Sequence, residues 1–435
     1  MKSLRRLAGP CLLAALVTVA GSPAAADERT RYQEHCAACH GETRLGGVGP
    51  ALLPQNLERL RKPEALSVIR DGRVATQMPG FADKLSADEV QQLADWIYTP
   101  VVPAPVWGES EIRDSHVVDA AAARLPARPG RGLKGADPLN LFIVVETGDH
   151  HVSVLDGDQL ERLHRFPSRY ALHGGPKFSP DGRFVYFASR DGWISKFDLY
   201  NLVVVAEVRA GLNTRNAAVS GDGKWVLVAN YLPHSLVLLD AMDLSLVRII
   251  PTWNAAGNKT SRVSAVYDAA PRKSFVVALK DVPEAWELSY DPAAEPVAEG
   301  LVHDFQYREG EFKPGMFHPR RTILTDYLDD FFFTQSYDEI LGSSRSATKG
   351  QVIFLDGRKK VAELDLPGMP HLGSGITWKW KDPAGRERTV MASPNLNAGL
   401  VTVIDLDTYE NVKQIATLGP GFFLRSHENS RYAFT

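Results

Sequence analysis

Two cysteines and a histidine form the clearest chemical motif of this 435-residue chain. Cys36, Cys39 and His40 stand in the sequence CAACH, which has the spacing of a c-type haem attachment site. On one turn of a helix, both thiols can bond to the haem vinyl groups while the imidazole ligates the iron. Met78, on a loop before Pro79, is the expected second axial ligand. The alternatives are a disulfide or redox pair for the cysteines and a core position for Met78.

A further histidine, His173, lies where a predicted strand opens into a loop. It is followed by Gly174 and Gly175, which leave room above the imidazole for a flat ligand. A PDG turn at 180–182 then begins a pair of predicted strands. His173 is therefore a candidate ligand-binding residue, and the alternative is an ordinary loop histidine.

The elements around the CAACH motif predict an exported protein with a small helical domain. Residues 1–26 contain a basic start, an apolar stretch too short for a membrane span and a small-residue cleavage site, which is the pattern of a secretory signal peptide. A capping box from Ser86 to Glu89 begins a segment with helical spacing. Residues 28–100 resemble a class I cytochrome c, which implies an all-α domain with covalent haem c.

The overall composition is that of an ordinary globular protein. The formal net charge is −3, and charged residues make up 23% of the chain. This balance gives no electrostatic reason to expect nucleic acid or a membrane surface as a partner. The length allows two or three domains, and residues 101–139, rich in proline and without apolar periodicity, are predicted to be a linker.

From residue 140 to residue 435, a pattern of strand, turn and returning strand recurs. Four short strands with their turns fit a period near 42 residues, which predicts the blades of an all-β propeller. Six blades and the start of a seventh are present, whereas a propeller must close to hide its strand edges. We therefore expect an eight-bladed propeller that is truncated at its C-terminal end. The repeat is marked by Asp156, Asp198, Asp240, Asp291, Asp356 and Asp405, spaced by 42, 42, 51, 65 and 49 residues.

The sequence of residues 172–216, which begins LHGGPKFSPDG, resembles the haem d1-binding propeller family. That family includes the nitrite reductase cytochrome cd1 and two proteins of haem d1 biosynthesis. The HGGPKFSPDG segment and the stretch VETGDHHVSVLDGD are more similar to the biosynthetic proteins. Together with an attached haem c, the resemblance implies a periplasmic dihydro-haem d1 dehydrogenase, which oxidises a propionate to an acrylate in the last step of haem d1 biosynthesis.

The resemblance also implies the roles of individual residues. His173 matches the proximal ligand of the d1 iron, and His318 and His371 match distal histidines, one of which is expected to take the proton. The resemblance leaves open which histidine ligates the iron. Guanidinium groups are suitable partners for the carboxylates of the macrocycle, although each could instead form a surface salt bridge. The expected contacts to the macrocycle are Arg190, Arg215, Arg262 and Tyr231, of which Tyr231 could also be a core residue.

Two other functions use the same residue types. A cytochrome cd1-type nitrite reductase would receive electrons through haem c and donate protons from the two distal histidines. A haem d1 carrier would bind the cofactor without turnover, but it would have no use for haem c. The expected partners are dihydro-haem d1, a periplasmic c-type cytochrome as electron acceptor, and nitrite reductase or other haem d1 assembly proteins.

Overall fold

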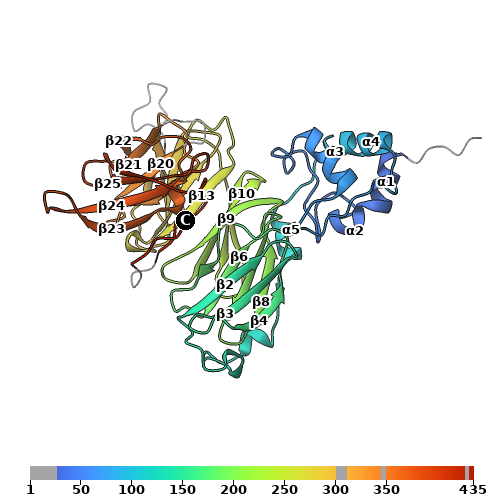
Figure 1. The fold of residues 1–435 in the computed structure, drawn as a ribbon, viewed down its shortest axis with the longest axis horizontal. Coiled ribbons are helices and arrows are strands. Elements are labelled where there is room, and N and C mark those ends of the chain that lie inside the picture. Colours follow the sequence, from blue (N-terminus) through green and yellow to red (C-terminus); the bar gives the residue numbers. More distant parts are fainter. Residues whose placement is uncertain (1–26, 300–310, 344–348, 427–430) are drawn as a thin grey trace, which may run out of the picture.

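The computed structural model describes residues 27–299, 311–343, 349–426 and 431–435. The predicted signal peptide lies outside the described residues. Among the helices of the described part, none is both long and apolar enough to cross a membrane. Figure 1 shows a small helical domain beside a fan of antiparallel sheets.

The N-terminal domain is helical, as predicted. Ser86 and Glu89 form the expected capping box at the start of its last helix. That helix buries Leu93 against Tyr32 and the other apolar residues of the domain core. The four helices are α1 (Glu28–His35), α2 (Ala37–His40), α3 (Lys62–Asp71) and α4 (Ala87–Ile97).

The segment predicted as a linker packs against the sheets over much of its length. Trp107 donates a hydrogen bond from Nε1 to the carbonyl oxygen of Arg209 (2.9 Å), and Ile112 is buried in a propeller core cluster. The short strand β1 adds to the outer edge of the second sheet. The elements of this segment are α5 (Glu109–Asp114), β1 (Val117–Val118), η1 (Ala122–Arg124) and η2 (Arg131–Leu133).

The remaining strands form six successive antiparallel sheets. The first three sheets contain β2 (Leu141–Glu146), β3 (His151–Asp156) and β4 (Arg162–Pro167); β5 (Lys177–Phe178), β6 (Phe184–Ala188), β7 (Trp193–Asp198) and β8 (Val203–Arg209); and β9 (Asn213–Val219), β10 (Trp225–Leu232), β11 (Ser235–Asp240) and β12 (Leu246–Pro251). The next three contain β13 (Val263–Ala269), β14 (Ser274–Leu279), β15 (Glu284–Ser289) and β18 (Arg320–Ile323); β19 (Asp330–Phe333), β20 (Glu339–Ser343), β21 (Lys349–Phe354) and β22 (Lys359–Asp365); and β23 (Ile376–Lys381), β24 (Glu387–Pro394), β25 (Leu400–Asp405) and β26 (Asn411–Ala416). A hairpin of β16 (Val297–Glu299) and β17 (Glu311–Lys313) is inserted in the fourth sheet, and the helices η3 (Ala270–Arg272) and η4 (Leu372–Ser374) are short.

Five of the six repeated aspartates accept backbone hydrogen bonds in the turn that follows their strand, whereas Asp356 accepts from Arg272. The Asp198 carboxylate accepts hydrogen bonds from the backbone N–H groups of Tyr200 and Asn201, and Asp405 accepts one from the N–H of Asp407. These contacts are those of Asx turns, which agrees with a structural role for the repeat.

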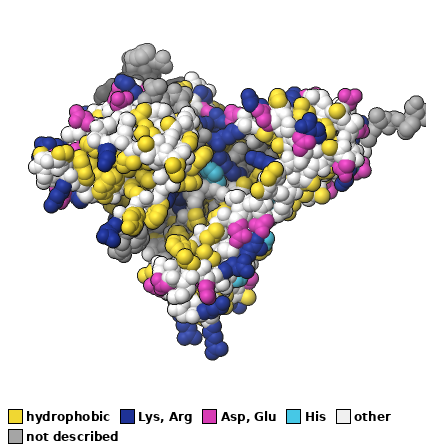
Figure 2. Space-filling model, in the orientation of Figure 1, with side chains coloured by type: hydrophobic (Ala, Val, Ile, Leu, Met, Phe, Trp, Pro, Cys, Tyr) yellow, Lys and Arg dark blue, Asp and Glu magenta, His cyan; other side chains and the backbone are white. Residues whose placement is uncertain are grey.

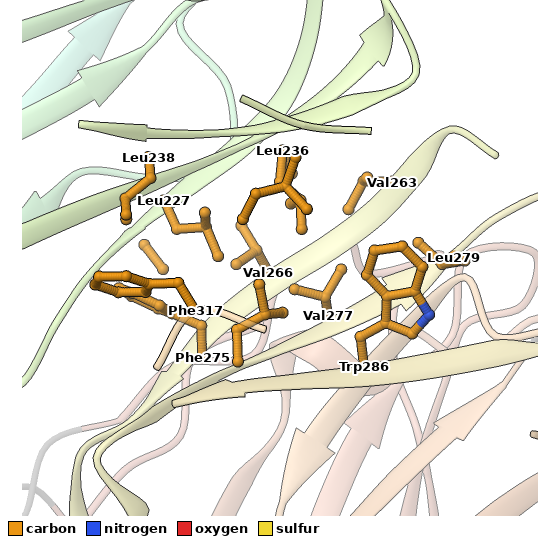
Figure 3. Close-up of a cluster of buried hydrophobic side chains, with 14 of the residues drawn as sticks. Leu227, Leu236, Leu238, Val263, Val266, Phe275, Val277, Leu279, Trp286 and Phe317 are labelled. Carbon is orange, nitrogen blue, oxygen red and sulfur yellow. The ribbon is translucent and has the colours of Figure 1, made fainter. Parts of the chain in front are cut away.

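Each sheet packs its face on the next, and the apolar cores lie between successive sheets. Figure 3 shows one such core, in which Leu236 and Leu238 of β11 face Phe275 and Val277 of β14. The first strands β9, β13 and β19 lie against one another near the middle of the fan. Radial packing of this kind confirms the β-propeller. Six blade sheets lie within the described residues besides the β16–β17 hairpin, so the total of eight blades stays a prediction.

Candidate functional site

The CAACH residues meet at the junction of α1 and α2. The described thiols of Cys36 and Cys39 are free, and His40 is buried. The Nδ1–H of His40 donates to the carbonyl oxygen of Pro50 (2.8 Å), because a carbonyl can only accept, so Nε2 keeps its lone pair for iron. Burial lowers the pKa of His40, which favours the neutral, ligating form. A Cβ on Gly49 would lie only 3.0 Å from His40 Cε1, so a glycine lets the loop pass close to the ring.

Met78 lies on a loop of the same domain and packs against its helical core. The carbonyl oxygen of Met78 accepts a hydrogen bond from the N–H of Arg73 (3.1 Å). A Cβ on Gly72, whose φ is +79°, would lie 2.8 Å from that oxygen, so the glycine is needed for this loop shape. Two thiols for covalent attachment, with an imidazole and a thioether as iron ligands, in one small domain fit a c-type haem.

A second site is a cavity of about 740 Å³ where the inner strands of the propeller converge. Figure 2 shows dark-blue and cyan side chains gathered in this hollow, between the sheets and the helical domain. The cationic lining and the cavity volume suit a large anionic ligand. The charged or titratable residues along its wall are Arg59, His173, Lys177, Arg215, Tyr267, Asp330, His371 and Arg425.

His173 lines this cavity as a neutral imidazole. Its Nδ1–H donates to the carbonyl oxygen of Arg215 (2.8 Å), which leaves Nε2 as the acceptor nitrogen. The guanidinium groups of Arg215 and Arg190 lie 2.8 and 3.4 Å from Nε2. Burial and then these two positive charges lower the pKa of His173 to about 3. A metal that replaced the guanidinium groups at Nε2 would meet an unprotonated ligand. A Cβ on Gly174 would lie 2.5 Å from Asn216 Cβ, so glycine is required there.

His371 lines the same cavity and belongs to a half-buried polar network. Its Nδ1–H donates to the carbonyl oxygen of Phe422 (2.6 Å), and its Nε2 lies 3.3 Å from Asp330 Oδ2. Tyr267 donates a hydrogen bond of 2.8 Å to Asp330 Oδ1. Burial alone would raise the pKa of Asp330, but the hydrogen bond that a protonated Nε2 of His371 donates and the charge of Arg215 hold that pKa below its usual value. A proton on Nε2 of His371 therefore has a carboxylate beside it.

His318 does not reach the central cavity, contrary to the sequence-based expectation. It precedes β18, the outermost strand of the fourth sheet, and lines a separate pocket of about 640 Å³. Its Nε2 lies 2.8 Å from Glu299 Oε1. Arg272 and Arg320 line the same outer pocket. The structure thus separates His318 from His173 and His371.

Two further predicted contacts lie beside the cavity. Tyr231 is buried between Arg190 and Arg262, whose guanidinium carbons lie 5.9 and 5.5 Å from its ring centre. Arg262 pairs with Asp281 (2.7 Å) and with Glu58 of the helical domain. Neither Tyr231 nor Arg262 lines the cavity, and Arg262 instead joins the propeller to the helical domain.

Sequence reasoning missed Asp330, Tyr267, Lys177 and Arg59. Tyr267 and Asp330 lie on inner strands β13 and β19, where their sequence context is that of ordinary strand residues. A Cβ on Gly373 would lie 2.4 Å from the Asp330 carboxylate, which makes this glycine part of the same network. No sequence spacing links these residues, because they meet from separate sheets and, for Arg59, from the helical domain.

A loop of the helical domain contacts the propeller next to His173. The N–H of Ala51 donates to Asp191 Oδ1 (3.2 Å), and Asn56 Nδ2 donates to the carbonyl oxygen of Leu212 (3.0 Å). Arg209 donates from Nε to the carbonyl oxygen of Asp191 (2.8 Å). Burial raises the pKa of the Asp191 carboxyl to about 6, although the Ala51 N–H and the Arg209 charge oppose this rise.

The raised pKa of Asp191 predicts a pH-dependent free energy of unfolding. The folded protein binds this proton more tightly than the unfolded chain, whose aspartate pKa is near 3.8, so stability falls as pH rises from about 4 to about 6. Asp191→Asn keeps an oxygen for Ala51 and does not titrate. The free energy of unfolding of the variant should match that of wild type near pH 4 and should be larger by roughly 2–3 kcal/mol at pH 7. Denaturant titrations at both pH values measure the difference, with Asp83→Asn at an exposed site as the control. An Asp191→Asn difference that does not change with pH would contradict the prediction.

Comparisons with known proteins agree with both sites. The cytochrome D1 heme domain family model matches residues 136–435, and the model of cytochrome C oxidase, cbb3-type, subunit III matches residues 23–97. The dihydro-heme d1 dehydrogenase of Pseudomonas aeruginosa is 55% identical over 424 residues, which are 98% of this chain and 79% of that protein. Protein NirF of the same species is 33% identical over 65% of this chain and 78% of its own length. A nitrite reductase of Stutzerimonas stutzeri is 26% identical over 86% of this chain and 67% of its own length.

A solved structure also aligns with this chain. The structure of dihydro-heme d1 dehydrogenase NirN in complex with DHE has a TM-score of 0.81 and 55% sequence identity. The alignment covers 94% of this chain and 81% of that one.

Proposed function

This chain belongs to the cytochrome D1 heme domain family, and from that premise we propose that it is a dihydro-haem d1 dehydrogenase. It is an oxidoreductase with covalent haem c in its helical domain and a haem d1-type tetrapyrrole as the ligand of its propeller. In the proposed reaction, a propionate of dihydro-haem d1 loses two hydrogens and becomes an acrylate, so two protons and two electrons leave the substrate. Haem c, which Cys36, Cys39, His40 and Met78 would hold, takes one electron at a time, so the two electrons would leave the substrate in two steps and pass on to an external acceptor.

One observation carries this proposal: the cationic cavity with its neutral histidine lies directly beside the loop of the cytochrome c domain. His173 presents an unprotonated Nε2 to the cavity, which suits a ligand of the substrate iron. Arg215 lines the same wall, where a guanidinium can pair with a carboxylate of the macrocycle. The contact of Ala51 with Asp191 keeps the electron-accepting domain next to this site.

We assign proton removal to His371 rather than His318, because only His371 lines the cavity with His173. Its Nδ1–H is engaged by the carbonyl oxygen of Phe422, so Nε2 is the atom that accepts the proton. The Asp330 carboxylate, 3.3 Å from Nε2, stabilises the imidazolium that results.

We also propose a periplasmic location and periplasmic partners. Residues 1–26 have the pattern of an export signal, and c-type haem attachment is in keeping with that location. A periplasmic c-type cytochrome then accepts the electrons, and nitrite reductase or another haem d1 assembly protein receives the product.

Anaerobic mixing of dihydro-haem d1 with at least a twofold excess of the oxidised, haem c-loaded protein tests the function, because each haem c accepts one electron. We expect the extracted tetrapyrrole to be lighter by two hydrogens and the haem c to become reduced. Unchanged pigment that stays bound would instead indicate a carrier. Turnover of nitrite with mature haem d1 and a reductant, without dehydrogenation, would indicate a nitrite reductase, and either result would overturn the proposal.

A further inference from the structure

Arg59 belongs to the helical domain, yet it lines the cavity at the centre of the propeller. Its positive charge is close enough to contribute to the low pKa of His173. We propose that Arg59 binds a carboxylate of the tetrapyrrole, so that an occupied cavity holds the cytochrome c domain on the propeller. This inference rests on the proposed function for the identity of the ligand.

The residues around Arg59 are tied to the propeller, which fixes its position over the cavity. Asn56 donates a 3.0 Å hydrogen bond to the carbonyl oxygen of Leu212. Glu58 forms an ion pair with Arg262, and Arg262 is held in turn by both oxygens of Asp281. Arg59 therefore reaches the cavity from a docked loop.

The charges that line the cavity show why a guanidinium from the helical domain would help to bind the carboxylates of the ligand. Asp330 is the acidic residue of the described lining, and it is already engaged by His371 and Tyr267. Arg215 is partly committed as well, because its Nε donates to the carbonyl oxygen of Ser264 (3.0 Å) and its Nη1 lies against His173.

Lys177 is similarly engaged, since its Nζ donates to the carbonyl oxygen of Gly174 (2.8 Å). A tetrapyrrole carries several carboxylates, which need further cationic partners in a partly dry site. A guanidinium gives each carboxylate a two-pronged contact that a lysine cannot. Arg59 adds a guanidinium from the helical domain to those of Arg215 and Arg425 in the cavity lining.

A ligand that contacts both domains must couple binding to docking. Because such a ligand binds the docked arrangement more tightly than the undocked one, docking is stabilised by the same factor when the ligand binds. The N–H of Ala51, which donates to Asp191 across the interface, reports on docking through its rate of hydrogen exchange.

The test uses Arg59→Gln in the full chain with haem c attached. Arg61→Gln is the matched control, because it removes the same charge two residues away at an exposed site, where Arg61 pairs with Glu64. In an optical titration with haem d1, we expect Arg59→Gln to raise the dissociation constant about tenfold and Arg61→Gln to leave it unchanged. Arg59→Lys keeps the charge, so its dissociation constant should lie between those of wild type and Arg59→Gln. If Arg59→Gln does not fold, Arg59→Lys takes its place in the comparison with Arg61→Gln.

The second readout is hydrogen exchange of the peptide that contains Ala51. Haem d1 should slow this exchange in wild type and in Arg61→Gln, but not in Arg59→Gln at saturating ligand. Equal affinities of the Arg59 and Arg61 variants, or equal slowing of exchange in both, would overturn the inference. If wild type binds haem d1 and shows the Arg59 effect but fails to oxidise dihydro-haem d1, the proposed reaction is wrong while the role of Arg59 in binding stands.

Discussion

Replacement of His173 by alanine is expected to reduce dehydrogenation on the order of 10²-fold or more while haem c stays attached. The imidazole is neutral at the cavity wall, with its Nδ1–H held by the Arg215 carbonyl and its Nε2 beside the guanidinium groups of Arg215 and Arg190, which the substrate iron would replace. Alanine removes the ligand but keeps the backbone N–H that bonds to the carbonyl oxygen of Ala188. The cationic residues around the cavity remain, so affinity for the tetrapyrrole should fall less than turnover.

Two comparisons make the His173 experiment specific. Imidazole added to the buffer should enter the space left by the side chain and restore part of the activity and the absorption spectrum of the ligated tetrapyrrole. His234→Ala is a suitable control, because His234 is partly buried and bonds to Thr260 Oγ1 but does not line the cavity. Full activity of His173→Ala, or a spectrum that does not change with the substitution, would contradict the assignment.

The low pKa of His173 also predicts the shape of the pH profile. Because burial and the two arginines hold its pKa near 3, the residue is neutral throughout the range from pH 5 to pH 9. Any fall in kcat/KM within that range should therefore come from a group other than His173. A direct titration of the ring by nuclear magnetic resonance in the ligand-free protein, with an apparent pKa above 5, would contradict this account.

The parts of the site that could be predicted are those carried by local sequence. Cys36, Cys39 and His40 lie within five residues, and His173 stands beside two glycines whose positive φ values shape its loop. The turns at Asp198 and Asp405 likewise depend on contacts two or three residues apart. In each case, the signal and the structure that it predicts span the same short segment.

The parts that could not be predicted depend on distant segments. Asp330 meets His371 and Tyr267 only because three sheets converge on the axis. Arg59 enters the cavity through docking of the helical domain, which no spacing within the propeller encodes. His318 shows the reverse case, since its motif resembled a distal ligand while the inserted hairpin and the outer strand place it in another pocket.

The double variant Cys36→Ser/Cys39→Ser is expected to lose covalent haem c and to reduce dehydrogenation to the rate of the uncatalysed mixture. Serine cannot form the thioether bonds, and haem c is the proposed electron acceptor in the helical domain. The propeller side of the cavity does not change, so the variant should still bind haem d1 in an optical titration. Turnover that continues at the wild-type rate would show that electrons leave by a different route.

Because loss of haem c can also unfold the helical domain, Met78→His separates the electron acceptor from the fold. Haem c stays attached through both cysteines, and replacing the thioether by a second imidazole lowers the potential of the iron. We expect slower reduction of haem c by dihydro-haem d1 with an unchanged dissociation constant, measured by stopped-flow absorbance. Met242→His, at an exposed position on the propeller, is the control for adding a histidine. If the potential falls in Met78→His but the rate does not, the helical domain does not accept the electrons of this reaction.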